Sequence, residues 1–204
     1  MKEGYLYDLF ISYVRQPPVL PWVNLFFKPT LEERIRCLFP SDPIIFVDDL
    51  SIPKGSKWPG KIIEALRTTK IIIPIWSADY FRSEWCVAEW ITMEERQKQI
   101  TQKEKKSVPI LFPIKFIDED YFPDLAKKTQ MEDLSEYNYT TPEFKKSEKF
   151  MNFEKKVEAI AKNICRIILD VPPWDPHWHI YSPDSQKVKK ILNQCQFKLN
   201  RPRM

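Results

Sequence analysis

Four short runs of consecutive apolar residues limit the possible fold more than any other feature of this sequence. They are rich in β-branched and aromatic side chains and span residues 7–13, 44–47, 71–76 and 108–114. A strand that is apolar on consecutive positions is buried on both faces, which is typical of a parallel sheet. The runs therefore predict parallel strands covered on each side by helices. A fifth, weaker strand is expected near residues 131–134.

Segments with helical character lie between and after these runs. Residues 30–38 begin with Thr30 and carry Glu33 three positions later, which is the spacing of a capping box. Residues 150–169 place apolar side chains at helical intervals. Further helices are expected at residues 59–68, 83–99 and 185–199. The alternation of strand and helix predicts a doubly wound α/β domain.

Proline-rich segments mark the boundaries of this domain. Residues 14–28 are interrupted by prolines and rich in aromatic side chains, so we expect a loop that packs locally rather than one that covers a site or binds a partner. A second cluster of prolines, between residues 171 and 183, is typical of a connector. We therefore expect one domain over residues 1–170, followed by a Pro/Trp-rich connector and basic tail over residues 171–204.

The composition disfavours several functional classes. The chain has only three glycines, so it lacks the clustered glycines of a Rossmann turn or a P-loop. Its two histidines and four singly placed cysteines form no ligand set for zinc, and we expect the cysteines to be reduced and mostly buried. No apolar run approaches the ~20 residues that span a bilayer, and the N-terminus is a poor signal peptide. We expect no metal site, no membrane segment and a cytoplasmic location.

The positive charge of the chain is unevenly distributed. Residues 171–204 account for the whole formal net charge of +4, while the charges of the remaining chain balance. A basic tail can bind nucleic acid, but a solvent-exposed helix is the simpler interpretation. Nucleic-acid binding is therefore expected only through this tail, if at all.

Candidate functional residues follow two of the predicted strands. Ligands of open α/β sheets bind outside the carboxyl ends of the strands, where this chain places the loop Asp48–Pro59 and the segment that begins at Ser77. Trp85 and Glu89 are four residues apart and share a helix face. A carboxylate on an aromatic face near a strand end is partly desolvated, which shifts its pKa. The alternatives are an ordinary loop and a helix glutamate that reaches water from the rim of the core.

Taken together, these segments resemble the Toll/interleukin-1 receptor (TIR) domain family over about residues 5–170. The run YDLFISY is similar to the first strand of that family, and IIFVDDLSIPKGSKW is similar to its second strand and BB loop. The run KIIIPIWSADYFRSEWCVAEW carries the specific pattern S-x-x-Y-x-x-S-x-W-C-x-x-E of the third strand and the helix after it. The run FEKKVEAIAKNICRII resembles the closing helix.

This resemblance implies a flavodoxin-like, five-stranded parallel sheet with helices on both faces. It also implies one of two functions, because some TIR domains are assembly modules and others cleave nicotinamide adenine dinucleotide (NAD+). In the enzymes a glutamate on the helix after the third strand is catalytic, and it corresponds to Glu89. NAD+ is then a substrate, and no cofactor is expected. The residues expected to bind it are Phe10, Ser12, Asp48, Lys57, Trp58, Ser77 and Trp85.

The expected chemistry needs only one carboxylate. Breaking the nicotinamide–ribose bond develops positive charge on the ribose, which a carboxylate stabilises much as in glycoside hydrolysis. The leaving group is already cationic, so no general acid is required. The companion product is ADP-ribose if water attacks and a cyclic isomer if a group of the same molecule attacks. By its size the chain also resembles the TIR protein of an anti-phage system such as Thoeris, in which a partner protein senses the nucleotide.

Two alternatives to a self-contained enzyme follow from the same resemblance. Family enzymes often complete their site through TIR–TIR contacts that include the BB loop, here Asp48–Pro59, so self-association is expected. A non-enzymatic scaffold, in which Glu89 is only structural, remains open. A receiver-like phospho-acceptor domain is disfavoured, because the first and third strands end in Ser12–Tyr13 and Trp76–Ser77 rather than in acids.

Overall fold

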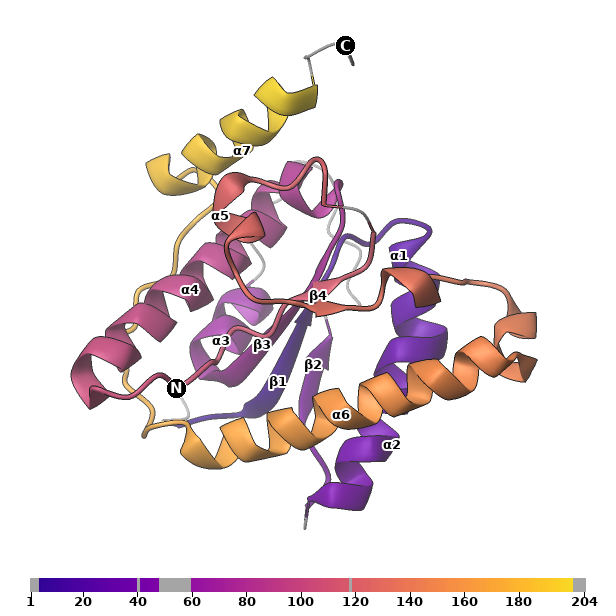
Figure 1. Cartoon of the computed structure of the whole chain (residues 1–204). Coiled ribbons are helices and arrows are strands. Elements are labelled where there is room, and N and C mark those ends of the chain that lie inside the picture. The colour runs from indigo at the N-terminus through magenta and orange to yellow at the C-terminus, as the bar shows by residue number, and fades with distance from the viewer. Residues whose placement is uncertain (1–3, 40, 48–59, 118, 200–204) are drawn as a thin grey trace.

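The fold is a five-stranded parallel sheet between two layers of helices (Figure 1). The computed structural model describes residues 4–39, 41–47, 60–117 and 119–199, with side chains up to residue 195. The strand order is β2-β1-β3-β4-β5, and every neighbouring pair is parallel, as predicted. The strands are β1 (Tyr7–Ser12), β2 (Ile45–Val47), β3 (Thr69–Trp76), β4 (Ile114–Lys115) and β5 (Glu132–Asp133).

Helices cover both faces of the sheet. Helices α2 and α6 pack against each other on one face, and α3 and α4 lie on the other (Figure 1). The longer helices are α2 (Lys28–Leu38), α3 (Gly60–Thr68), α4 (Glu84–Glu104), α6 (Glu148–Asp170) and α7 (Gln186–Leu199). The short helical segments are α1 (Val19–Trp22), η1 (Val23–Phe27), η2 (Tyr80–Arg82), α5 (Asp124–Lys127), η3 (Ser135–Tyr137) and η4 (Pro142–Lys146).

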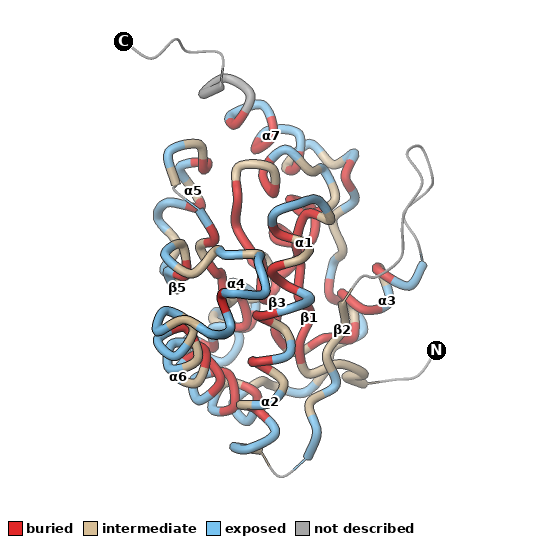
Figure 2. The backbone as a smooth tube through the Cα atoms, turned by 90° about the vertical axis from the view of Figure 1, so that its right-hand side faces the viewer, coloured by how far each residue is buried: buried red, intermediate tan, exposed pale blue. Residues whose placement is uncertain are grey.

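The alternation of side chains along β1 divides the core into two parts. Leu9 and Ile11 belong to the cluster shared with α2 and α6, whereas Phe10 packs in the cluster shared with α3 and α4. Because successive strand residues point to opposite faces, Ser12 points to the same face as Phe10. Figure 2 shows the central strands β1 and β3 as largely buried backbone between the helical layers. The end of β1 therefore places a hydroxyl group beneath α4.

The prediction of a strand over residues 108–114 is wrong in the extent of the strand. Regular pairing is limited to Ile114–Lys115, with one isolated bridge between Ile72 and Leu111. Pro109 and Pro113 lie in the predicted segment. Proline has no N–H to donate to a strand ladder, so the chain follows β3 here with few ladder bonds.

The prediction of a loop over residues 14–28 is wrong for most of this segment. Segments α1, η1 and α2 follow one another without a break from Val19 to Leu38. The prolines that indicated a loop are tolerated, because Pro21 lies in the first helical turn, where an N–H has no partner in the helix. Local packing, the preferred interpretation of the aromatic residues, is confirmed. The buried side chains recur at helical spacing and are Val19, Trp22, Val23, Phe26 and Phe27.

The chain after α6 packs on the domain. The segment 171–185 runs beside α4, and α7 packs against α4 and η2 (Figure 1). Five of its side chains are buried in the core cluster that includes α4, namely Trp178, Val188, Ile191, Leu192 and Cys195. These residues therefore contribute to the core of the α3–α4 face, while the expected domain boundary at residue 170 stays a prediction.

A buried arginine joins this C-terminal segment to the body of the domain. Arg96 of α4 is 2% exposed, and its guanidinium donates hydrogen bonds to the carbonyl oxygens of Leu66 and Thr69. The guanidinium carbon lies 4.4 Å from the centre of a Trp178 ring. Burial lowers the Arg96 pKa to about 10, which still leaves the side chain charged at neutral pH. The ring and the carbonyl dipoles thus replace the water that the charge has lost.

All four cysteines are free thiols, and three of them are buried, as expected. Within the described residues, no group of three His, Cys, Asp or Glu side chains is placed to hold a metal ion. The described helices include none with the length and apolar character needed to cross a bilayer.

The packing of α7 predicts a large loss of stability when its buried face is truncated. Ile191→Ala leaves a cavity in the core and is expected to lower the free energy of unfolding by about 2–4 kcal/mol. Lys189→Ala changes an exposed residue of the same helix and is the matched control, with an expected change within about 0.5 kcal/mol. Urea unfolding of the full chain measures both. Equal effects of the two substitutions would show that α7 does not pack as described.

Candidate functional site

The candidate site lies at the switch point of the sheet. The chain leaves β1 toward β2 on one side and returns to β3 on the other, so the strand order reverses between β1 and β3. Ligands of open α/β folds bind outside the carboxyl ends of the strands at such a point. Ser12 is the last residue of β1, and Ser77 directly follows β3. The topology therefore brings together two segments that the sequence analysis singled out.

Local hydrogen bonds fix the connection between β3 and α4. The backbone N–H of Tyr80 lies 3.1 Å from the carbonyl oxygen and 3.2 Å from the hydroxyl oxygen of Ser77, and η2 begins there. Ser83 then caps α4, because its hydroxyl accepts from the backbone N–H of Cys86 at 3.3 Å. Glu89 follows in the second turn of α4. These two turns place the side chains of Tyr80 and Glu89 over the end of β1.

Three buried oxygen-bearing side chains form a chain of hydrogen bonds. The Ser12 hydroxyl donates to Glu89 Oε2 at 2.5 Å, and Ser12 Oγ lies 2.9 Å from the Tyr80 hydroxyl oxygen. The exposed fractions are 1% for Ser12, 0% for Tyr80 and 5% for Glu89. Glu89 is thus almost fully withdrawn from solvent, yet it has a defined polar partner.

Burial makes Glu89 titrate near neutral pH. Loss of solvent raises its pKa to about 7, while the hydrogen bond from Ser12 and the positive charge of Arg15 act in the opposite direction. This confirms the expected desolvation of the carboxylate. Burial also raises the pKa of the Cys86 thiol and of the Tyr80 hydroxyl. Because these two groups remain neutral, Glu89 is the member of this cluster that changes its charge near pH 7.

The other expected binding residues differ in their accessibility. Trp85 lies one turn before Glu89 and is half-buried. Phe10 is 0% exposed and packs against Phe46, with ring centres 4.9 Å apart, so its ring lies below the surface of the site. The Ser77 hydroxyl is engaged with the backbone of η2. Substrate contact by these residues stays a prediction.

Three expected binding residues and the expected assembly loop cannot be placed. Asp48, Lys57 and Trp58, together with the loop Asp48–Pro59, lie outside the described residues.

Sequence reasoning missed two residues of the site. Tyr80 belongs to the S-x-x-Y part of the pattern quoted above, but no role followed from its spacing. Arg15 is the first charged residue after β1, and its proximity to Glu89 follows only from the folded structure. The available signals were the fixed spacing of Tyr80 from Ser77 and the position of Arg15 at a strand end that predicts ligand binding.

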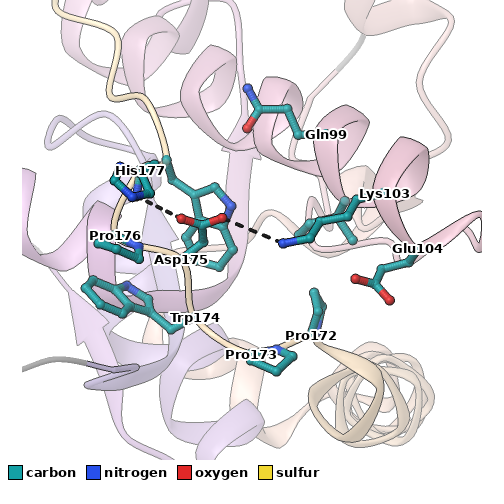
Figure 3. Close-up of a pocket in the computed structure, with 11 residues that line it drawn as sticks. Gln99, Lys103, Glu104, Pro172, Pro173, Trp174, Asp175, Pro176 and His177 are labelled. Carbon is teal, nitrogen blue, oxygen red and sulfur yellow. Dashed lines mark hydrogen bonds and ion pairs between the residues drawn. The ribbon is translucent and has the colours of Figure 1, made fainter.

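A separate groove lies at the other end of α4. It has a volume of 560 Å³ and runs between the last turns of α4 and residues 172–178. Figure 3 shows Lys103 directed toward Asp175, with Nζ and Oδ2 3.8 Å apart, and Asp175 also accepts from the backbone N–H of His177 at 2.9 Å. Glu89 does not line this groove. The carboxylate there is already engaged, which favours a structural role for these polar groups.

Comparison with known proteins finds similarity over most of the chain. The family model described as TIR domain matches residues 9–147, more than half of the chain. Among solved structures, the chain is similar to the TIR domains of the activated Roq1 resistosome that directly recognises the pathogen effector XopQ. The identity is 18%, the TM-score is 0.41, and the match covers 80% of this chain and 84% of that one.

A second similar structure is the TIR domain of the Toll-related receptor TRR-2 from Hydra magnipapillata. The identity is 19%, the TM-score is 0.42, and the match covers 74% of this chain and 98% of that one. No curated protein matches the chain.

The raised pKa of Glu89 predicts a specific dependence of stability on pH. The folded state binds the Glu89 proton more tightly than the unfolded state, whose pKa is near 4.5. The stabilisation is therefore complete below pH 4.5 and is lost as the pH rises through about 7. Glu89→Gln does not titrate, so its stability relative to the wild type is expected to rise by about 2–3 kcal/mol between pH 5 and pH 8. Urea unfolding at both pH values measures the difference, and a constant difference would contradict the raised pKa.

Proposed function

The chain belongs to the TIR domain family, and from this membership we propose that it cleaves the nicotinamide–ribose bond of NAD+ with Glu89 as the catalytic carboxylate. Membership does not choose between the enzymes and the scaffolds of the family. The observation that carries the proposal is the position of Glu89, buried at the switch point with a pKa near 7. Perturbed carboxylates at ligand-binding crevices are typical of catalytic groups.

The energetic cost of this arrangement supports a functional role. An ionised carboxylate loses hydration when it is buried, and one hydrogen bond from Ser12 offsets only part of that loss. An apolar side chain at the same position of α4 would pack without this cost. Retaining an acid there is therefore better explained by chemistry at the site than by packing alone.

The chemistry requires Glu89 in its ionised form. As the bond to nicotinamide breaks, the pyridinium becomes neutral nicotinamide and the positive charge moves to the ribose. A carboxylate in a site with little water stabilises this charge more strongly than it would in bulk solvent. Attack by water then yields ADP-ribose, and attack by a group of the same molecule yields a cyclic ADP-ribose isomer.

The other expected site residues are proposed to bind NAD+ for this reaction. The half-buried ring of Trp85, one turn from Glu89, offers a flat apolar surface to an aromatic ring of the substrate. Further contacts with NAD+ are assigned to Phe10, Ser12, Asp48, Lys57, Trp58 and Ser77. NAD+ is a substrate in this scheme, and the site needs no cofactor.

We place this reaction in immune signalling in the cytoplasm, in a bacterial anti-phage setting where a partner protein senses the nucleotide product. Four free cysteine thiols agree with a reducing compartment. The alternative function is a non-enzymatic TIR scaffold. It is favoured by the hydrogen bond from Ser12, which also serves to hold α4 on β1 and gives Glu89 a structural use.

Removal of the carboxylate is expected to abolish NAD+ cleavage. Concentrated wild-type protein incubated with NAD+ should release nicotinamide, and Glu89→Gln should reduce the rate by at least about 10²-fold, because the charge that stabilises the ribose cation is lost. Chromatography and mass spectrometry measure nicotinamide and its companion product. Lys189→Ala, on the exposed side of α7, is the control and should retain the wild-type rate. Equal rates for wild type and Glu89→Gln would favour the scaffold.

Self-association is expected to control the activity. TIR domains associate with each other, and here contacts that include Asp48–Pro59 are proposed to complete the site. The rate per subunit should therefore fall by tenfold or more on dilution from micromolar to nanomolar concentration. Turnover per subunit across a dilution series, followed together with particle size by light scattering, measures this effect. A rate per subunit that is independent of concentration would indicate a site complete in one chain.

A further inference from the structure

We propose that Tyr80 is a positioning residue for Glu89: its hydroxyl donates to Ser12 Oγ and thereby directs the single Ser12 hydroxyl hydrogen onto the Glu89 carboxylate. The catalytic consequence of this inference rests on the proposed function, whereas the hydrogen-bond chain itself does not. Tyr80 acts on Glu89 through Ser12 and is not assigned a contact with substrate.

The three oxygens come from three different elements of the fold. Ser12 ends β1, Tyr80 opens η2, and Glu89 lies in α4. The hydroxyl oxygens of Tyr80 and Ser12 are 2.9 Å apart, and Ser12 Oγ lies 2.5 Å from Glu89 Oε2. These distances are normal for hydrogen bonds between oxygens, and the second is at the short end, as expected for a charged acceptor.

The direction of the chain follows from counting hydrogens. With Glu89 ionised, Tyr80 and Ser12 supply one hydrogen each, and both of the observed contacts are filled. The Ser12 hydroxyl has a single hydrogen, which it donates to Glu89 Oε2. The hydrogen in the contact between Tyr80 and Ser12 therefore comes from the Tyr80 hydroxyl, and Tyr80 is the donor to Ser12.

Tyr80 is held firmly enough to serve this role. Its backbone N–H is bonded to Ser77, and its ring packs against Phe81 with ring centres 5.4 Å apart. The side chain is 0% exposed, and α7 packs against the η2 segment that carries it. The hydroxyl thus has little freedom to leave Ser12.

The surroundings of Glu89 shift its pKa in opposing directions. Arg15, after β1, favours the anion of Glu89, as does the hydrogen bond from Ser12. Burial favours the neutral acid. Among the described residues, Cys86 on α4 and Tyr80 on η2 also interact electrostatically with Glu89, and burial keeps both neutral. Donation from Tyr80 polarises the Ser12 hydroxyl and strengthens its bond to the carboxylate, since hydrogen bonds in a chain reinforce one another.

The test is the titration of the Glu89 carboxyl in the full chain, followed by carbon-13 NMR with Glu89→Gln to assign the signal. Tyr80→Phe keeps the buried ring but removes the donor, so the pKa of Glu89 is expected to rise by about half to one pH unit. Ser12→Ala removes the direct bond and should raise it further. Tyr5→Phe is the matched control, because it removes a partly buried hydroxyl that donates to the Pro172 carbonyl, and it should leave the Glu89 pKa unchanged.

A double variant separates an effect through Ser12 from a direct one. Ser12→Ala removes the hydrogen-bonded route from Tyr80 to the carboxylate, and Tyr80 itself stays neutral. Adding Tyr80→Phe should therefore leave the Glu89 pKa where Ser12→Ala placed it. An additional rise of the same size would overturn the proposed relay. An unchanged Glu89 pKa in the folded single variant Tyr80→Phe would overturn the role of Tyr80 altogether.

The rate of NAD+ cleavage supplies an independent readout. The pH at which kcat/KM reaches half its maximum on the acidic side should shift upward in Tyr80→Phe by the same amount as the Glu89 pKa. Absence of any NAD+ cleavage in the wild type would contradict the proposed function, but the carboxyl titration would still decide the role of Tyr80. A shifted Glu89 pKa with an unshifted rate profile would show that the relay exists and does not serve catalysis.

Discussion

The burial of β1 on both faces is the constraint on which the site depends. A central strand of a parallel sheet has no solvent side, so each of its side chains needs a partner inside the protein. Leu9, Phe10 and Ile11 meet this condition with apolar neighbours. Apolar neighbours are not enough for Ser12, because its buried hydroxyl requires hydrogen bonds. Glu89 and Tyr80 form these hydrogen bonds with the Ser12 hydroxyl and thereby connect β1 to α4 and η2. A polar residue at the end of a buried strand thus organises the polar cluster around it.

Two buried charges on α4 show how differently one helix can stabilise ionic groups. Arg96 is surrounded by carbonyl oxygens and the ring of Trp178, and its pKa of about 10 keeps it charged at neutral pH. Glu89 has a single hydroxyl donor, and its pKa of about 7 places it between its two charge states. The first arrangement stabilises a charge permanently and joins chain segments. The second leaves the charge state responsive to its surroundings, which is the property that a reacting group needs.

The sequence predicted those features that depend on local pattern. Consecutive apolar runs indicated the parallel strands, and the segment from Ser77 to Glu89 predicted a desolvated acid at a strand end. Features that depend on distant contacts were missed. Prolines in residues 14–28 indicated a loop, although the apolar stripe around Trp22 and Phe27 has helical spacing and is stabilised by packing. Tyr80 and Arg15 gained their roles only when the turn after β3 and the end of β1 met, a juxtaposition that no local pattern specifies.

The scaffold and the enzyme place different demands on the same cluster. A scaffold requires only that β1, η2 and α4 be connected, and a neutral Glu89 side chain would meet that demand with a hydrogen bond of either direction. The hydrogen bond from Ser12 and the charge of Arg15 favour the Glu89 anion, whereas burial outweighs them and raises the pKa to about 7. The proposed cleavage needs the ionised carboxylate, so it depends on this balance near neutral pH. A scaffold places no such demand on the charge state of Glu89.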